Sequence, residues 1–184
     1  MTTAAIVLAA GEGSRFIGAT HKLLADFRGR ALWTWAVDAA LDANLDTTYV
    51  VTGAVDLAVR NALTIVHNDA WAQGQATSLA AGIAAAAAGG HDAVVIGLAD
   101  QPLIGPDAWT AVAASTGSPI AVASFSGDRR PPVRLAAEVW PLLPTTGDEG
   151  ARVVMRERPD LVTAVPCSGE PVDIDTLEDL ERWS

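Results

Sequence analysis

The amino-acid sequence predicts an α/β protein, a single three-layer α/β/α domain over residues 1–184 with a mostly parallel, Rossmann-like sheet. Short apolar runs of the kind found in buried parallel strands alternate along the chain with longer segments typical of helices. The chain has 184 residues, of which 50% are hydrophobic, and this suits one domain, since single domains commonly span about 100–200 residues. We find no internal repeat and no linker that would divide it.

The first half of the chain predicts three strands and three helices. In order, these are a strand at 4–8, a glycine-rich loop, a helix at 31–41, a strand at 48–52, a short helix at 55–62, a strand at 63–66, a polar loop at 68–76 and a helix at 77–88. The first strand is a continuous apolar run, and the second is rich in residues that favour strands. Gly53 ends the second strand, and Gly89–Gly90 closes the alanine-rich third helix.

The second half continues the alternation. It predicts a strand at 93–98, a helix that begins near Pro106, a strand at 120–123, an arginine- and proline-rich segment, short helices at 135–142 and 150–158, a strand at 161–165 and a closing helix at 177–183. The run from Ala93 to Leu98 is the clearest buried strand of the chain. Pro106 suits the first turn of a helix because that position needs no backbone N–H.

Three features of the chain fall on one edge of the predicted sheet. In open α/β sheets, ligands bind outside the carboxyl ends of the strands. This rule places together the loop after Leu8, the loop after Val66 and Asp100, which follows the strand at 93–98. We therefore expect a binding site at this edge.

The charge distribution argues against a nucleic-acid-binding protein. The formal net charge is −10, whereas nucleic-acid binding depends on basic patches. Residues 1–30 are the exception, with four basic side chains against two acidic ones. Lys22, the only lysine of the chain, is one of the four and lies just past the glycine-rich loop. Such a local positive patch attracts an anionic ligand.

The composition also predicts a cytoplasmic protein with no membrane span. No apolar run approaches the about 20 residues that a membrane span needs. Met1–Thr3 leads into the first strand without a basic n-region, so we expect no signal peptide. Cys167 is the only cysteine, which excludes internal disulfides and thiol metal clusters.

The glycine-rich loop has the composition of a phosphate site. Gly11, Gly13 and Gly18 let the backbone approach a phosphate closely and direct N–H groups at it. Arg15 offers a planar fork for phosphate oxygens and Lys22 a point charge. The loop therefore predicts a site for a phosphorylated ligand.

Two familiar phosphate loops are excluded by named residues. Gly13 and Gly18 have the spacing of a P-loop, but Ala19-Thr20 follows where Lys-Ser/Thr is required. The loop begins like a dinucleotide fingerprint, but Phe16 stands where the third glycine is needed. The second strand also ends in Thr52-Gly53 instead of an acid that could bind a ribose.

The loop Leu8-Ala9-Ala10-Gly11-x-Gly13-x-Arg15-Phe16, followed by Lys22-Leu23-Leu24, resembles the signature of the GT-A-like nucleotidyltransferases, particularly the MobA/MocA molybdenum-cofactor group. Four further blocks are similar to that family and follow its order: Gly74-Gln75-Ala76-Thr77-Ser78-Leu79-Ala80-Ala81-Gly82, residues 97–103 with Asp100, residues 147–152, and Asp173-Ile174-Asp175-Thr176 with the helix after it. The resemblance covers almost the whole chain.

This resemblance implies a Mg²⁺-dependent nucleotidyltransferase that moves a nucleoside monophosphate from an NTP to a phosphorylated acceptor and releases pyrophosphate. Ala10 favours CTP over GTP, because Leu-Ala-Ala-Gly loops go with the cytidylyltransferases of the group. The implied acceptor is molybdopterin or the molybdenum cofactor, and a molybdoenzyme is a possible protein partner.

Two alternatives stay open. The acceptor-side block of the family, usually Gly-His-Pro-Val, reads Arg130-Pro131-Pro132-Val133 here. Because the histidine is absent, the acceptor could instead be a sugar phosphate or another small phosphorylated metabolite. A non-catalytic nucleotide-binding accessory protein of a molybdoenzyme is the third hypothesis. Arg129 and Arg130 could contact an anionic acceptor or be solvated loop residues.

The implied roles of individual residues follow from the same blocks. We expect Arg15, Lys22 and Asp100 to be catalytic, and Asp100 with Asp175 to hold Mg²⁺, which prefers one or two carboxylates together with phosphate oxygens. Asp173 is the alternative second ligand, and helix capping at Thr176 is an alternative role for both aspartates. The expected nucleotide-binding residues are Leu8, Ala9, Ala10, Gly11, Gly13, Gly74, Gln75 and Ser78. His21, His67 and His91 are too scattered to form a metal cluster.

Overall fold

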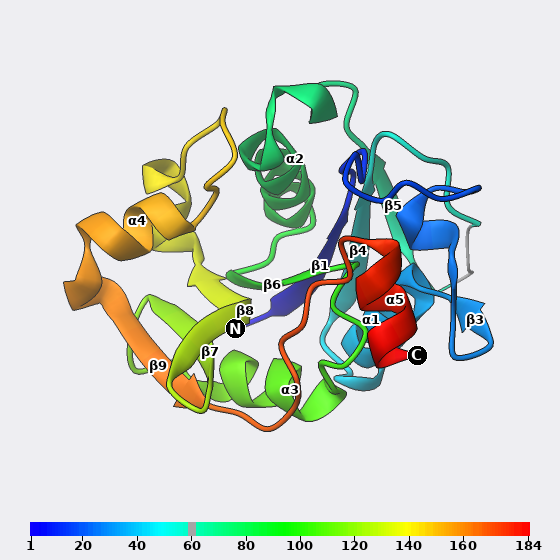
Figure 1. Cartoon of the computed structure of the whole chain (residues 1–184). Coiled ribbons are helices and arrows are strands. Elements are labelled where there is room, and N and C mark those ends of the chain that lie inside the picture. The colour runs from blue at the N-terminus through cyan, green and yellow to red at the C-terminus, as the bar shows by residue number, and fades with distance from the viewer. Residues whose placement is uncertain (59–61) are drawn as a thin grey trace.

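The computed structural model describes residues 1–58 and 62–184, and within them seven strands form one sheet (Figure 1). The strand order is β5 (Thr64–His67), β4 (Thr47–Thr52), β1 (Thr3–Ala9), β6 (Ala93–Leu98), β8 (Asp128–Ala136), β7 (Ile120–Phe125) and β9 (Val162–Pro166). Neighbouring strands are parallel from β5 to β6 and between β7 and β9, whereas β8 is antiparallel to both of its neighbours. The predicted α/β fold with a mostly parallel sheet is confirmed.

Helices cover both faces of the sheet, which gives the three predicted layers (Figure 1). One face carries α1 (Trp33–Asp42), α3 (Pro106–Ala114) and α5 (Leu177–Trp183), and the other carries α2 (Gln75–Ala88) and α4 (Arg152–Glu157). The alternation of side chains along β1 decides which residues serve each face. Ala5, Val7 and Ala9 belong to the core under α1 and α3, whereas Ala4, Ile6 and Leu8 belong to the core under α2.

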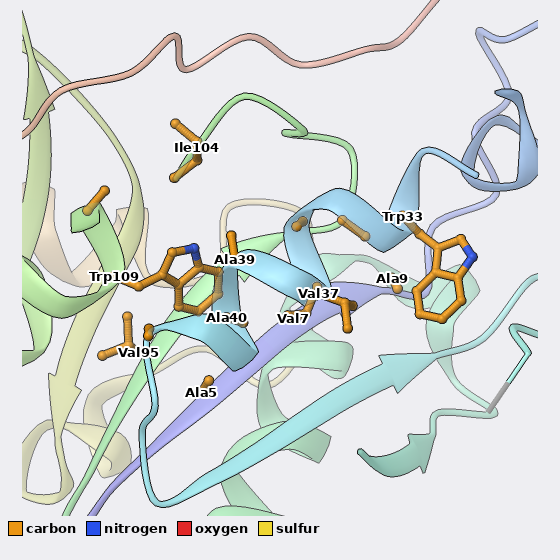
Figure 2. Packing of buried hydrophobic residues seen from close by; sticks show 14 of the residues in the cluster. Ala5, Val7, Ala9, Trp33, Val37, Ala39, Ala40, Val95, Ile104 and Trp109 are labelled. Carbon is orange, nitrogen blue, oxygen red and sulfur yellow. The ribbon is translucent and has the colours of Figure 1, made fainter. Parts of the chain in front are cut away.

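The core under α1 and α3 is built around two tryptophans (Figure 2). Trp33 and Val37 of α1 lie over β1, and Trp109 of α3 lies near Val95 of β6. Trp109 reaches the sheet at Gly97, where an added Cβ would stand 2.3 Å from the indole ring. The close approach of this helix to the sheet therefore depends on a residue without a side chain.

Short elements connect the layers. They are the 3₁₀ helices η1 (Lys22–Leu24), η2 (Trp71–Gln73), η3 (Ala137–Leu142) and η4 (Pro159–Leu161), and the hairpin of β2 (Asp26–Phe27) and β3 (Arg30–Ala31). Among the helices of residues 1–58 and 62–184, none has both the length and the apolar character needed to cross a membrane.

The arginine- and proline-rich segment is a strand, which the sequence pattern did not predict. It forms β8, inserted between β6 and β7, and the predicted helix at 135–142 is wrong at its start because Leu135 and Ala136 end this strand. Proline normally interrupts strands because it cannot donate to the ladder. Here the pairing with β7 shifts between Val122 and Ala123, so that the cis-linked Pro131-Pro132 falls in the irregularity.

The predicted short helix at 55–62 is wrong for residues 55–58, which form no helix, while residues 59–61 lie outside the described part of the chain. Val55 and Leu57 both pack against the core under α1. Side chains two residues apart share one side of an extended backbone but not of a helix, so burial of both favours the extended form. The other predicted helices and strands are present, with ends shifted by a few residues.

Candidate active site

A polar cavity of about 570 Å³, here called the main cavity, opens at the edge of the sheet where β1 and β6 end. Its walls come from the loop after β1, from η2 and the start of α2, from the end of β6 and from the segment before α5. The three features that the topological rule predicted at one edge, including Asp100, therefore lie together. Asp173 and Asp175 join them from the far end of the chain.

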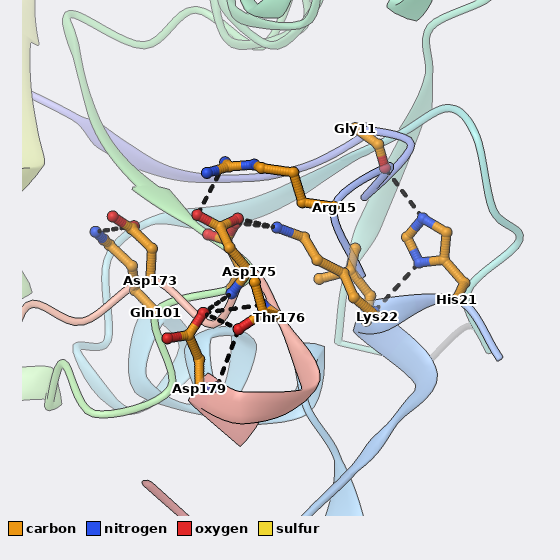
Figure 3. A network of polar contacts seen from close by, with 11 residues as sticks. Gly11, Arg15, His21, Lys22, Gln101, Asp173, Asp175, Thr176 and Asp179 are labelled. Atoms are coloured by element: carbon orange, nitrogen blue, oxygen red, sulfur yellow. Dashed lines mark hydrogen bonds and ion pairs between the residues drawn. The ribbon is translucent and has the colours of Figure 1, made fainter. Parts of the chain in front are cut away.

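Lys22 is the centre of the charged group in the main cavity (Figure 3). Its Nζ donates to Asp100 Oδ2 at 2.7 Å and to Asp175 Oδ1 at 2.9 Å. Arg15 Nη2 lies 2.9 Å from the other oxygen of Asp175. The lysine side chain is 10% exposed, whereas that of Arg15 is 74% exposed. The sequence-predicted cations and carboxylates are therefore brought into direct contact.

The local sequence explains how Lys22 reaches this position. It is the first residue of η1, which His21 caps by accepting from the N–H of Leu23. The other ring nitrogen of His21 lies 3.1 Å from the carbonyl of Gly11, which ties η1 to the glycine-rich loop. Gly13 has a φ of +67°, and a Cβ there would stand 2.9 Å from Cγ of Lys22. Gly13 thus provides room for the lysine stem.

The two C-terminal carboxylates are held by the backbone around them. Ile174 is fully buried, and its N–H donates to the carbonyl of Asp100 at 3.0 Å, so the segment is tied to the end of β6. The N–H of Asp175 donates to Asp179 Oδ2, which also belongs to the capping box of α5 with Thr176 (Figure 3). The capping role that the sequence offered as an alternative for Asp173 and Asp175 is filled by Thr176 and Asp179 instead.

Burial and neighbouring charges shift the pKa values of Lys22 and Asp173. Burial alone would lower the pKa of the Lys22 ammonium, but the charges and hydrogen bonds of Asp100 and Asp175 outweigh it and hold that pKa above the ordinary lysine value. Burial raises the pKa of Asp173, and the neighbouring charge of Asp100 raises it further. Gln101 Nε2 donates to Asp173 Oδ1 at 2.9 Å and partly offsets this rise.

The carboxylates have the chemistry of a Mg²⁺ site that uses few protein ligands. Among the described residues, no three His, Cys, Asp or Glu side chains gather around one point. Mg²⁺ keeps several waters and needs only one or two carboxylates with substrate phosphates. Asp100 Oδ1 is buried and has no hydrogen-bond partner among the described residues, so this carboxylate retains an unused ligand atom. Asp100 with Asp175 or Asp173 therefore fits such an ion.

The start of α2 forms the wall opposite the lysine. Gly74 has a φ of +110°, and a Cβ there would stand 2.5 Å from the backbone of Gly147, so the two loops approach closely. The N–H of Ala76 donates to the carbonyl of Gly147 at 2.8 Å. Ser78 is buried and accepts a hydrogen bond from Asn68 Nδ2 at 2.9 Å.

Most of the sequence-predicted nucleotide residues line the main cavity. These are Leu8, Ala10, Gly11, Gly74, Gln75 and Ser78. Ala9 does not, because β1 turns it into the core under α1, where it is 2% exposed. Gly13 is also absent from the lining and acts through the room that it leaves for Lys22.

Several residues of the site were missed from the sequence. Trp71, Asp148 and Arg152 line the main cavity, and Asn68 holds the first turn of α2 by donating to Thr77 and Ser78. Asp148 and Arg152 belong to one of the blocks that resemble the nucleotidyltransferases, so a signal was present. Trp71 and Asn68 have no local signal, because their roles depend on how the loop after β5 folds onto α2.

A second, more apolar cavity of about 260 Å³, here called the side chamber, adjoins the main cavity. The two share five lining residues, namely Leu8, Gln75, Leu98, Arg130 and Arg152. The rest of the side chamber is mostly aliphatic, from α2, β6, β7, β8 and α4, with Arg129 and Glu149 as further charged residues. Together the two cavities can hold two reactants side by side, with cations at their junction.

Comparison with known proteins agrees with this geometry. The model of the MobA-like NTP transferase domain family matches residues 5–162. Nicotine blue oxidoreductase of Paenarthrobacter nicotinovorans is 32% identical over 96% of this chain and 94% of its own length. Purine catabolism protein PucB of Bacillus subtilis (strain 168) is 29% identical over 96% of this chain and 93% of its own.

The fold also matches solved structures. Rv0371C from Mycobacterium tuberculosis H37Rv, solved in complex with manganese, superposes with a TM-score of 0.78. The match covers 100% of this chain and 98% of that chain at 22% sequence identity. At this level of identity the likeness establishes the fold.

Proposed function

Since the chain belongs to the family of MobA-like NTP transferase domains, we propose that it is a Mg²⁺-dependent cytidylyltransferase, which moves CMP from CTP to molybdopterin or the molybdenum cofactor. The observation that carries the proposal is the meeting of Lys22, Arg15, Asp100 and Asp175 in one cavity at the end of β1 and β6. A single domain over residues 1–184, a cytoplasmic location and delivery of the product to a molybdoenzyme are further parts of the same proposal.

The reaction needs alignment and charge neutralisation more than covalent chemistry. A phosphate oxygen of the acceptor attacks the α-phosphorus of CTP and forms a new P–O bond. The bond from the α-phosphorus to the bridging oxygen breaks, and its electron pair leaves with pyrophosphate. Arg15 and Lys22 neutralise the triphosphate and the leaving group, and the cavity walls hold the two reactants in line.

Asp100 with Asp175 would hold Mg²⁺, with Asp173 as the alternative second ligand. The bound ion would supply Lewis-acid neutralisation of the phosphate oxygens. Ala10, Gly11, Gln75 and Ser78 line the main cavity and are the proposed contacts to the nucleoside.

The side chamber is the proposed place of the acceptor, because it adjoins the main cavity and has arginines where the two meet. Aliphatic residues such as Ile96 and Val133 can pack on the face of a ring, and Gln75 and Glu149 can pair with its polar edge. Arg130 and Arg152, at the junction of the two cavities, suit the phosphate of the acceptor. Pro131 stands where the family has histidine. For this reason a sugar phosphate or another small phosphorylated metabolite remains the alternative acceptor.

One experiment separates these functions. Pyrophosphate release is measured with Mg²⁺ and each of the four NTPs, alone, with molybdopterin and with glucose 1-phosphate. We expect release with CTP only when molybdopterin is present. Release with glucose 1-phosphate instead would support the second acceptor class. Nucleotide binding without release under any condition would contradict both enzyme hypotheses and favour an accessory protein.

Two variants test the site itself. Asp100→Asn keeps the shape of the side chain and removes its charge, and we expect turnover to fall by about 100-fold or more, as for other groups that stabilise transition-state charge. Arg158→Gln is the matched control, because Arg158 is exposed, pairs with Asp160 and lines neither cavity. Equal activity of the Asp100 variant and the control would make the assigned site wrong. Because one relative is named as an oxidoreductase, binding of NADH in place of CTP would also contradict the proposal.

A further inference from the structure

The only lysine of the chain lies where two proposed metal ligands converge. The Nζ atom of Lys22 is 2.7 Å from Asp100 Oδ2 and 2.9 Å from Asp175 Oδ1. These two residues come from the end of β6 and from the segment before α5, so the ammonium joins parts of the chain that are far apart in sequence. The side chain is only 10% exposed and lines the main cavity.

We propose that Lys22 is a positioning residue that acts as an internal cation. While no nucleotide is bound, its ammonium holds Asp100 and Asp175 together in the place of the divalent cation. It leaves them for the triphosphate when the nucleotide arrives. This inference rests on the proposed function, because it assumes that the two aspartates bind the metal.

Charge is the reason why ammonium and metal exclude one another. A divalent cation held by these two carboxylates would meet an ammonium that is already 2.7 Å from Asp100 Oδ2 and 2.9 Å from Asp175 Oδ1. Like charges this close repel strongly away from bulk water. The triphosphate offers the ammonium several new negative oxygens, so nucleotide binding removes the obstacle to the metal.

The surroundings of Lys22 allow the exchange. The stem passes the bare backbone of Gly13, where a Cβ would stand 2.9 Å from Cγ of Lys22 and restrict its movement. Arg15 pairs with the second oxygen of Asp175, so this carboxylate keeps one cationic partner while the lysine moves. His21 holds η1 through the carbonyl of Gly11, so the base of the side chain stays in position.

The inference has a thermodynamic consequence. If the nucleotide draws the lysine away from the carboxylates, it raises the affinity for the metal. By linkage, the metal then raises the affinity for the nucleotide by the same factor. Metal alone is expected to bind weakly, and metal with nucleotide tightly.

Because the chain has a single lysine, selective ¹³C-lysine labelling reports on this side chain alone in the wild-type protein. We expect one Cε–Hε cross-peak, which stays in place with millimolar Mg²⁺ and moves when Mg²⁺ and the non-reactive analogue α,β-methylene-CTP are added together. A peak that moves with Mg²⁺ alone at low concentration, or that stays in place when the analogue binds, would overturn the inference. This experiment needs no variant.

The second experiment measures Mn²⁺ binding without nucleotide, by the loss of the free-ion EPR signal. Lys22→Met keeps the length of the side chain and removes its charge, and we expect Mn²⁺ to bind about 10-fold more tightly, within the range usual for binding coupling between sites. Lys22→Arg keeps the charge and is expected to resemble the wild type, as is Arg158→Gln. Unchanged Mn²⁺ affinity in a folded Lys22→Met protein would contradict the internal-cation role.

The two proposals fail in different ways. If CTP is turned over but the lysine peak and the Mn²⁺ affinities do not change as expected, only the internal-cation role is wrong. If neither CTP nor any other NTP binds in the presence of metal, the proposed function itself is wrong, and this inference falls with it.

Discussion

At the scale of single residues, three aspartates, Asp100, Asp173 and Asp175, line the main cavity. Asp100 and Asp175 share the ammonium of Lys22, whereas Asp173 accepts from the amide of Gln101. Burial, and then the charge of Asp100, raise the pKa of Asp173. Its ionised form is therefore disfavoured in the native protein.

Asp173→Asn tests this cost through the pH dependence of stability. Because the native pKa of Asp173 lies above the unfolded value, its contribution to stability is complete below the unfolded pKa and is lost as pH rises through the native pKa. Asparagine keeps the acceptor for Gln101 without the charge. We therefore expect the metal-free variant to melt at a higher temperature than the wild type at pH 7, and this difference to close in acid.

The size of the gain is limited by the partial exposure of the residue. About 1 kcal/mol corresponds to roughly 2–4 °C in a chain of this size, and we expect no more. The control is Asp160→Asn, since the hydrogen bond from Arg158 lowers the pKa of this exposed carboxyl and predicts no gain at pH 7. Melting by circular dichroism from pH 3 to pH 8 makes the comparison. A gain that is as large in acid as at pH 7 would refute the assignment to charge.

At the scale of elements, α5 links helix capping to the site. Asp179 Oδ2 accepts from the N–H groups of Asp175 and Thr176 and from the hydroxyl of Thr176. A capping interaction is worth about 1 kcal/mol to a helix. In this helix the same carboxylate also fixes the backbone of a residue that contacts Lys22 and Arg15.

Asp179→Ala is expected to lower stability by about 1 kcal/mol, and also to weaken Mn²⁺ binding in the presence of α,β-methylene-CTP, because the backbone of Asp175 loses its anchor. Urea unfolding and EPR titration measure the two effects. Glu178→Ala is the control, since Glu178 is exposed in the first turn of the same helix and lines neither cavity. Equal metal affinity in the two variants would limit Asp179 to helix capping.

Element prediction succeeded where the signal is local and failed where it is not. The apolar run of β1, the alanine-rich α2 and the closing helix α5 follow from composition and end signals over a few residues. In contrast, β8 contains Pro131-Pro132, which locally argue against a strand. Its pairing with β6 and β7 overrides that preference, and such long-range pairing cannot be read from the segment alone.

At the scale of the whole molecule, the close packing of α3 on the sheet depends on a glycine of β6. Gly97 of β6 lies under the indole of Trp109, and an alanine Cβ would stand 2.3 Å from that ring. Trp109 is 2% exposed and packed in the core, so it has little room to move. The position of α3 on the sheet, and with it the end of β6 that leads to Asp100, depends on this contact.

Gly97→Ala is therefore expected to destabilise the protein by about 1–3 kcal/mol, the usual cost of overpacking a core. Urea unfolding followed by tryptophan fluorescence measures the change. Gly117→Ala is the control, because no described atom lies within 4 Å of a Cβ built there and its φ is not in the left-handed region. If the two variants have the same midpoint, the close packing of α3 on β6 does not limit stability.

The sequence by itself determined the fold class, the family and the chemical types at the site. Strand and helix periodicity, the glycines of the first loop, the lone Lys22 and Asp100 after a buried strand are local patterns that physical rules can interpret. They excluded the P-loop and dinucleotide loops and pointed to one edge of the sheet. A single domain, the preference for CTP and the acceptor remain predictions.

Only the tertiary structure decided which charges meet. The contact between Lys22 and Asp175 joins residues 153 positions apart, and the side chamber is lined by residues of β1, α2, β6, β7, β8 and α4. The insertion of β8 and the docking of loop 147–148 on the start of α2 also depend on pairing over long distances. The physical reason is that local patterns specify the conformation of each segment, whereas burial and hydrogen bonding between distant segments specify where each side chain lies.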